Sequence, residues 1–186
     1  DAINSCKFKN TRLIYIQLFL MELPGDFNHT NTLIIDLKKE TIERFEPHGK
    51  GTSTKEFKDN DKYNLFINNL IIKLFNKIDL NYKFIAPSLI STKLGIQRYD
   101  TDSYCGMCLT ISMMYLHMRI LNLDIEQSEI VDYFLKLNKK TLKNNILQYA
   151  KYIEKTLKKN SDIVNKFTKE LNYLRNDIRQ FKNIVL

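Results

Sequence analysis

The sequence is short of cysteine, tryptophan and long apolar runs, and each shortage excludes a class of protein. It has three cysteines (Cys6, Cys105 and Cys108) in 186 residues and no tryptophan. Three cysteines do not make the disulfide framework of a small secreted domain, so a reducing compartment fits the chain best. The longest apolar run, Leu13–Leu23, is interrupted by polar residues and is too short to span a bilayer. We therefore expect a soluble protein with no membrane segment.

What the chain does have is an ordinary globular composition with an excess of lysine. Hydrophobic residues make up 44% and the net charge is +8, which favours a single folded domain over residues 1–186. The lysines recur in predicted helices such as Lys139–Lys143 and Lys155–Lys159. They could bind nucleic acid weakly, or they could simply form a solvated face. The start at Asp1 rather than Met indicates a processed chain or a piece of a longer one.

The first half of the chain predicts a small, mostly antiparallel sheet. Arg12–Met21 is rich in β-branched and aromatic residues, as a buried strand would be. Thr32–Leu37 and Thr41–Phe45 are two further strands, and the polar turn between them makes a hairpin. Tyr82–Ala86 looks like a fourth strand, which Pro87 ends.

Helices fill the rest of the chain. Apolar residues at steps of three and four predict an amphipathic helix over Tyr63–Ile78. Cys105–Leu121 is apolar nearly all round and belongs in the middle of the fold. The fold class is therefore α+β, with the sheet packed on this central helix. The core covers about residues 11–122, and a helical extension follows over about 126–186.

Three helices are expected in that extension. The first is Ser128–Leu137, and the second carries apolar residues from Leu142 to Leu157. The third, Val164–Phe181, repeats apolar residues at alternating steps of three and four, as a heptad seam does. This seam could close a helical hairpin on its own domain, or it could dock a partner.

Cys105 is the candidate nucleophile. It directly precedes the central helix, where free backbone N–H groups and the helix dipole stabilise a thiolate. The same N–H groups can stabilise an oxyanion. Cys108 lies one turn further on and is interpreted as a packed helix residue, because no second cysteine–histidine pair at ligand spacing completes a zinc site. No metal or other cofactor is expected.

A nucleophilic cysteine needs a base, and the chain has three histidines. His117 lies on the same helix as Cys105, roughly 18 Å along it, and is too far away. His29 stands just before one strand of the hairpin, and Glu46 stands just after the other. Pairing across the hairpin places Glu46 opposite about Asn31, close enough to orient His29. His48 remains a reserve candidate for the base.

The run from His29 through Phe45-Glu46-Pro47, followed by Gln97 and then Cys105-Gly106, resembles the adenovirus maturation protease and the wider superfamily of SUMO-deconjugating cysteine peptidases. The resemblance covers roughly Arg12–Leu121. It implies His29 as base, Glu46 as the orienting acid, Cys105 as nucleophile and Gln97 as oxyanion-hole donor. Where the family usually has Trp after the histidine, this chain has Thr30, which argues against a SUMO-type substrate.

The resemblance implies a thiol-dependent hydrolase that cleaves peptide or isopeptide bonds. Its partner would be a protein substrate, either a ubiquitin-like conjugate or a viral or pathogen precursor protein. Its location would be the cytoplasm or nucleus of a host cell, or the virion. The alternative is a non-catalytic basic interaction module that binds a protein partner or nucleic acid through its lysine-rich surface and helical tail.

Overall fold

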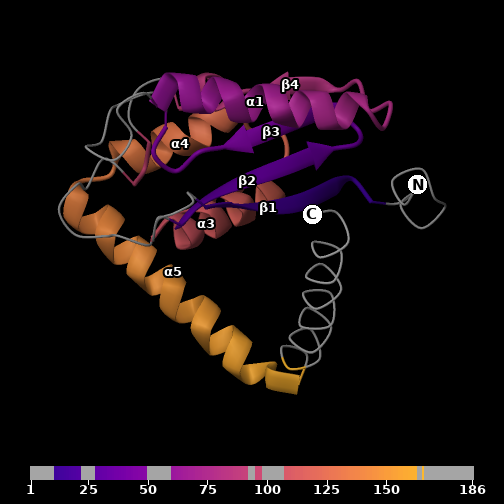
Figure 1. Ribbon diagram of the computed structural model, residues 1–186. Helices are drawn as coiled ribbons and strands as arrows, with labels where there is room; N and C mark the ends of the chain where they lie inside the picture. The colour runs from indigo at the N-terminus through magenta and orange to yellow at the C-terminus, as the bar shows by residue number, and fades with distance from the viewer. Residues whose placement is uncertain are drawn as a thin grey trace. The chain divides into compact units, whose positions relative to one another are not determined.

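The computed structural model describes residues 11–21, 28–49, 60–91, 95–97, 107–162 and 165 (Figure 1). The chain divides into two compact units, Asp1–Ile146 and Leu147–Leu186. None of the helices in the described ranges combines the length and the apolar character that a bilayer crossing requires. The apolar residues of the predicted heptad seam, from Val164 to Phe181, lie outside the described residues.

A four-stranded sheet forms the centre of the first unit, in the order β1-β2-β3-β4. Strands β1 (Leu13–Met21) and β2 (Asn28–Asp36) pair antiparallel over their full lengths, and β3 (Thr41–Phe45) pairs antiparallel with β2. Strand β4 (Lys83–Ile85) joins the far side of β3 in the parallel direction. The expected mostly antiparallel sheet is present, and the class is mixed α+β.

The β2–β3 hairpin turns where the sequence places its polar residues. Asp36 accepts hydrogen bonds from the backbone N–H groups of Lys38 and Lys39 at 2.9 and 3.0 Å, and Glu40 takes a positive φ of 53°. Strand β2 begins at Asn28, four positions before the predicted start at Thr32 (32 − 28 = 4). The polar run at its start is extended because each of its residues pairs with β1. His29 therefore lies inside a strand rather than before one.

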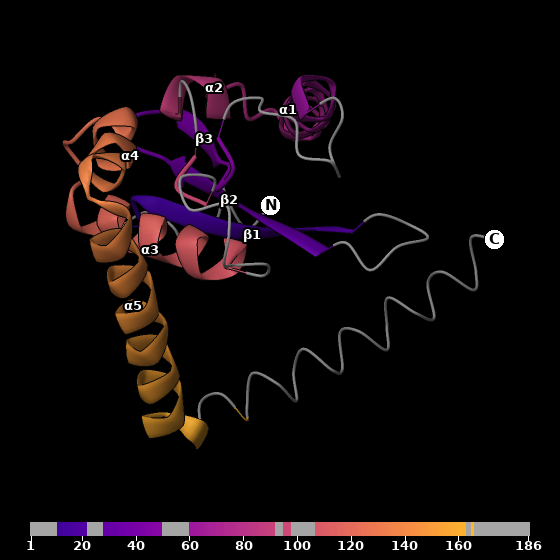
Figure 2. The same cartoon turned by 90° about the vertical axis from the view of Figure 1, so that its left-hand side faces the viewer.

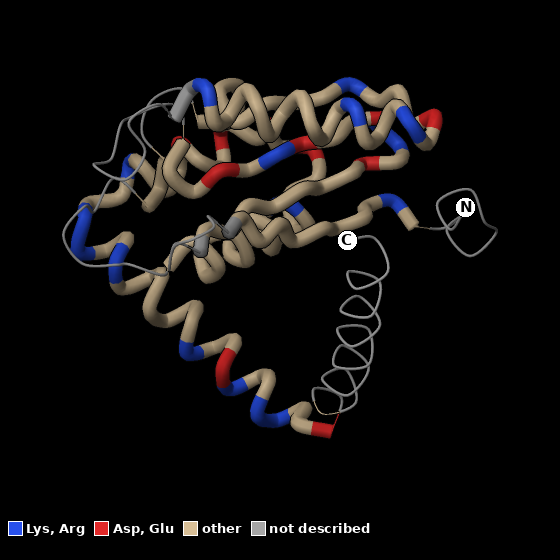
Figure 3. The backbone as a smooth tube through the Cα atoms, viewed as in Figure 1, with Lys and Arg blue, Asp and Glu red and all other residues tan. Residues whose placement is uncertain are grey.

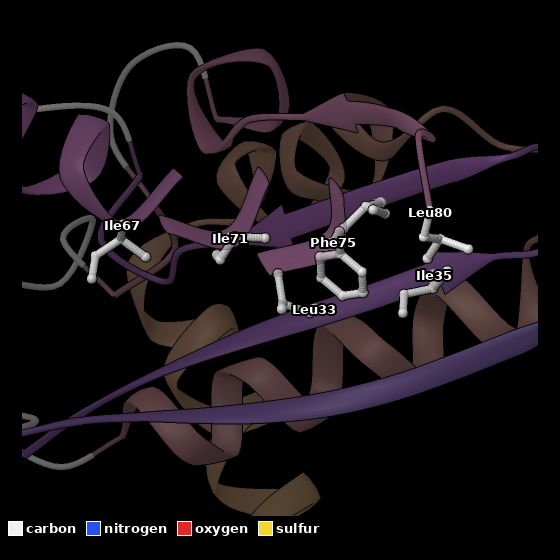
Figure 4. Close-up of a cluster of buried hydrophobic side chains, with 7 residues drawn as sticks. Leu33, Ile35, Ile67, Ile71, Phe75 and Leu80 are labelled. Carbon is white, nitrogen blue, oxygen red and sulfur yellow. The ribbon is translucent and has the colours of Figure 1, made fainter. Parts of the chain in front are cut away.

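Helix α1 (Asn60–Asn76) covers one face of the sheet. In Figure 4 its residues Ile67, Ile71 and Phe75, spaced one turn apart, point at Leu33 and Ile35 of β2. Strand alternation explains this pairing, because residues two apart share a face of the sheet. This cluster is the apolar core on that side.

Helix α3 (Cys108–Leu121) lies on the opposite face, and the sheet is sandwiched between α3 and α1 (Figure 2). Its Tyr115 stacks on Phe45 with ring centroids 3.9 Å apart. Arg119 forms an ion pair with Glu43 at 3.0 Å, and both side chains are buried. The Tyr115 hydroxyl and Gln127 of helix α4 (Gln127–Lys136) also donate to Glu43. A buried carboxylate with three polar partners fixes α3 and α4 against β3.

Two helices remain in the described ranges. Helix α2 (Pro87–Ile90) is a single turn that follows β4, with Pro87 at its first position. Helix α5 (Lys139–Lys159) begins in the first unit, where Leu142 and Ile146 are buried, and continues into the second. Helix α4 and the start of α5 therefore belong to the same compact unit as the sheet.

Candidate functional site

The start of helix α3 brings a thiol against strand β2. In the structure α3 begins at Cys108, which is buried and 5% exposed. The Cys108 thiol hydrogen-bonds the His29 side chain and Thr30, both on β2. One turn further along α3, Ser112 donates to the Thr30 carbonyl at 3.4 Å. The predicted nucleophile, Cys105, lies outside the described residues.

His29 and Glu46 meet at the open end of the hairpin. Thr32 pairs with Phe45, so the next position along places Asn31 opposite Glu46, as the sequence predicts. His29 Nε2 lies 2.6 Å from Glu46 Oε1, and Asn31 Nδ2 donates to Glu46 Oε2 at 2.8 Å. Both His29 and Glu46 are buried. With Nε2 held by Glu46, Nδ1 is the ring nitrogen that remains for Cys108.

A buried arginine, Arg44, contacts the Glu46 carboxylate. Arg44 is fully buried, and its Nη2 lies 3.5 Å from Glu46 Oε2. Its other donors reach Asn31 Oδ1 at 2.7 Å and two asparagines of α1, Asn64 and Asn68, at 2.8 and 2.7 Å. A buried guanidinium is tolerated only when its donors are satisfied, and these partners satisfy them. The arginine thus ties the position of Glu46 to helix α1.

The segment after β3, residues 46–49, is held by hydrogen bonds from residues 95–97. The Gly95 and Gln97 N–H groups donate to the carbonyls of His48 and Pro47, each at 3.0 Å. A Cβ at position 95 would collide with the backbone of residues 47–49, so only glycine allows this close approach. The contact holds the His48 ring 4.8 Å from the ring of His29. Gln97, the predicted oxyanion-hole donor, therefore lies beside this turn and is half-buried.

The side chains of Glu46, His29 and Cys108 shift one another's pKa values. Burial alone would raise the pKa of Glu46, but the His29 hydrogen bond and the charges of His29 and Arg44 lower it to about 2. Burial alone would lower the pKa of His29, but its bonds to Cys108 and Glu46 raise it to about 9. Burial alone would raise the pKa of Cys108, but His29 and Thr30 lower it. These directions favour a thiolate–imidazolium pair beside a carboxylate.

Sequence reasoning selected His29 and Glu46 but assigned Cys108 to packing. Cys108 is buried in α3, as a packed helix residue would be, and it also contacts His29. Because Cys105 and Cys108 are one helical turn apart, their spacing could have kept both cysteines as candidates for the thiol that contacts His29. The described residues contain no cluster of three or more His, Cys, Asp or Glu side chains placed to hold a metal ion. Chemically, the site places a thiol beside an imidazole that a carboxylate orients.

A second candidate is the apolar stripe of helix α5. Leu142, Ile146, Ile153 and Leu157 fall on one helical face at steps of four, seven and four. Leu142 is 1% exposed, whereas Leu157 is 51% exposed. The stripe therefore continues past the part of the helix that its own fold covers. Figure 3 shows basic residues recurring along the same helix.

Comparison with known proteins gives one distant relative. No family model matches the chain, and no solved structure matches it. The chain is 26% identical over 145 residues to an ankyrin repeat protein of Acanthamoeba polyphaga mimivirus, covering 68% of this chain and 18% of that protein. The chain thus spans less than a fifth of its relative's length.

These findings contradict two expectations drawn from the sequence. Membership of the adenovirus-protease and SUMO-peptidase superfamily is wrong, because the relative is an ankyrin repeat protein and no peptidase family matches. The assignment as a thiol-dependent hydrolase falls with it. The hydrogen bond between His29 and Glu46 is present, but the superfamily roles assigned to Cys105 and Gln97 lose their basis.

Proposed function

We propose that the chain is a non-catalytic interaction module that binds an acidic protein through the apolar stripe of helix α5. The carrying observation is the stripe itself, buried at Leu142 and Ile146 and open at Leu157. An amphipathic helix that leaves part of its apolar face uncovered is suited to a groove on another protein. The ankyrin repeat protein supports this reading, because ankyrin repeats stack into extended binding surfaces.

The charge of α5 specifies the partner. The helix has seven lysines and one glutamate, for a net charge of +6 (7 − 1). A basic amphipathic helix is typical of segments that enter acidic, apolar grooves. Lysines such as Lys151 and Lys155 lie away from the apolar stripe, so they steer the encounter while the stripe supplies the contact area.

A protein groove explains α5 better than nucleic acid does. The helix contains no arginine, the residue that most often reads bases or stacks on them. Its exposed tyrosine, Tyr152, and Leu157 are 60% and 51% exposed. Phosphate binding alone would leave the stripe residue Leu157 in water, whereas an apolar groove buries it.

Calcium-loaded calmodulin, a defined acidic protein with an apolar groove, is the probe that tests this proposal. Fluorescence anisotropy should show the full chain binding the calcium-loaded form and not the calcium-free form. We expect Leu157→Glu to weaken binding about tenfold or more, because it places a charge in the groove. Leu121→Glu is the matched control, since Leu121 is 77% exposed on another helix and should leave binding unchanged.

Two results would overturn the proposal. The first is that a DNA duplex binds more tightly than the acidic groove at equal salt. The second is that Leu157→Glu and Leu121→Glu bind the groove equally well. Either result would leave the lysines as a solvated or phosphate-binding face.

A further inference from the structure

The cluster of Cys108, His29 and Glu46 is not used by the proposed interaction surface. It comes from three separate segments: the start of α3, strand β2 and the turn after β3. All three side chains are buried, with exposed fractions of 5%, 3% and 2%. Burying a carboxylate, an imidazole and a thiol together costs desolvation free energy. A thiol that only filled space would not need the other two groups.

The geometry orients the imidazole toward the sulfur. Glu46 Oε1 holds His29 Nε2 at 2.6 Å, and the Cys108 thiol hydrogen-bonds the same ring. Asn31 and the His48 N–H also bind the Glu46 carboxylate, at 2.8 and 3.0 Å. The carboxylate is thereby fixed, and it in turn fixes the ring.

The local charges favour a sulfur anion beside a cationic ring. Cys108 is the first residue of α3, where the helix dipole favours negative charge. Among the residues that the structure describes, Arg44 pairs with Glu46, and the ring of His48 lies 4.8 Å from that of His29. Arg44 balances the charge of Glu46, so the carboxylate does not repel the thiolate strongly.

We propose that Cys108 is a covalent modification site, a thiolate paired with the His29 imidazolium that takes a small peroxide as its electrophile. Because only 5% of Cys108 is exposed, a small electrophile suits the site better than a bulky one. The protonated ring distinguishes this site from an isolated thiol, because it can deliver a proton to a leaving oxygen.

The reaction balances with hydrogen peroxide as the oxidant. A sulfur lone pair of the Cys108 thiolate attacks one peroxide oxygen, the S–O bond forms and the O–O bond breaks. The leaving hydroxide takes the proton from the His29 imidazolium and departs as water. Cys108 becomes a sulfenic acid, oxidised by two electrons, and the peroxide is reduced. His29 is left neutral and still held by Glu46.

The test uses the full chain with Cys6→Ser and Cys105→Ser, so that Cys108 is its single thiol. Oxidation by hydrogen peroxide is followed by intact mass and by trapping the sulfenic acid before peptide mapping. At pH 6 we expect Cys108 to react at least about tenfold faster than free cysteine, because the latter is almost all protonated there. His29→Gln should remove this advantage. His117→Gln, a histidine substitution on α3, should keep it.

The pH profile keeps the proposal testable even if His29→Gln does not fold. In the chain that retains His29, the oxidation rate should stay nearly constant between pH 6 and 8. A rate that rises about tenfold per pH unit across this range would show an ordinary protonated thiol and overturn the proposal. Equal rates for Cys108 and free cysteine at pH 6 would overturn it as well.

Discussion

At the scale of single residues, Arg44 and Arg12 offer a comparison of a fully buried arginine with a partly exposed one. Arg44 is fully buried beside Glu46, whereas Arg12 is 26% exposed beside Asp36. We expect Arg44→Ala to lower the free energy of unfolding by about 3–5 kcal/mol, because it leaves a buried carboxylate and three amides short of a donor. Arg12→Ala should cost less, because Asp36 keeps its hydrogen bonds from the Lys38 and Lys39 N–H groups. Guanidinium denaturation measures both, and equal losses would contradict the prediction.

The low pKa of Glu46 predicts how stability depends on acid. Its folded value of about 2 lies below its ordinary value of 4.5. A depressed acid contributes stability that is present above 4.5 and is lost as the pH falls toward about 2, here about 3 kcal/mol. The free energy of unfolding of the unsubstituted chain should therefore fall between pH 5 and 2. Glu46→Gln should show a shallower fall, and parallel curves for the two chains would refute the assignment.

The contact between His29 and Glu46 could be predicted because it depends only on counting residues across a hairpin. Once the turn lies at residues 37–40, the register follows from strand geometry. The contact of Cys108 with His29 could not be predicted in this way. It depends on where α3 begins along β2, which is set by how the helix packs on the sheet.

At the scale of elements, helix α1 carries neighbouring buried and exposed apolar residues, so the effect of core packing on stability can be measured within one helix. Phe75 is 9% exposed and belongs to the apolar core, whereas its neighbour Leu74 is 53% exposed. We expect Phe75→Ala to reduce the free energy of unfolding by about 3–5 kcal/mol through loss of burial and a residual cavity. Leu74→Ala should change it by less than about 0.5 kcal/mol. Urea denaturation measures both changes, and a larger loss for Leu74→Ala would mean that α1 is rotated relative to this description.

Helices α1, α4 and α5 could be predicted from the sequence. Apolar residues at steps of three and four lie on one helical face, and that face packs against the rest of the protein. The start of strand β2 was harder to predict, since its first residues, Asn28–Asn31, are polar. They are extended because β1 pairs with them and because polar groups of the hairpin's open end satisfy them. Their strand state is a consequence of tertiary contacts.

At the scale of the whole molecule, the boundary between the compact units can be tested by shortening the chain. A variant that ends at Ile146 keeps the buried residues Leu142 and Ile146 but loses the exposed part of the α5 stripe. We expect it to unfold cooperatively, with a midpoint close to that of the full chain, and to lose binding to the acidic groove. Circular dichroism during thermal unfolding measures the first property and anisotropy the second. Loss of cooperative unfolding would show that residues 147–186 belong to the same folding unit.

The sequence by itself determined the apolar parts of the strands, the amphipathic helices, the hairpin register and the basic character of α5. Periodicity, turn residues and charge are local properties, and they act on the chain wherever it lies. Only the tertiary structure decided that Cys108 contacts His29 and that Arg44 pairs with Glu46. It also decided that the apolar stripe of α5 is buried at Leu142 and exposed at Leu157. These features join segments far apart in the chain, and their distances follow from packing that no local pattern records.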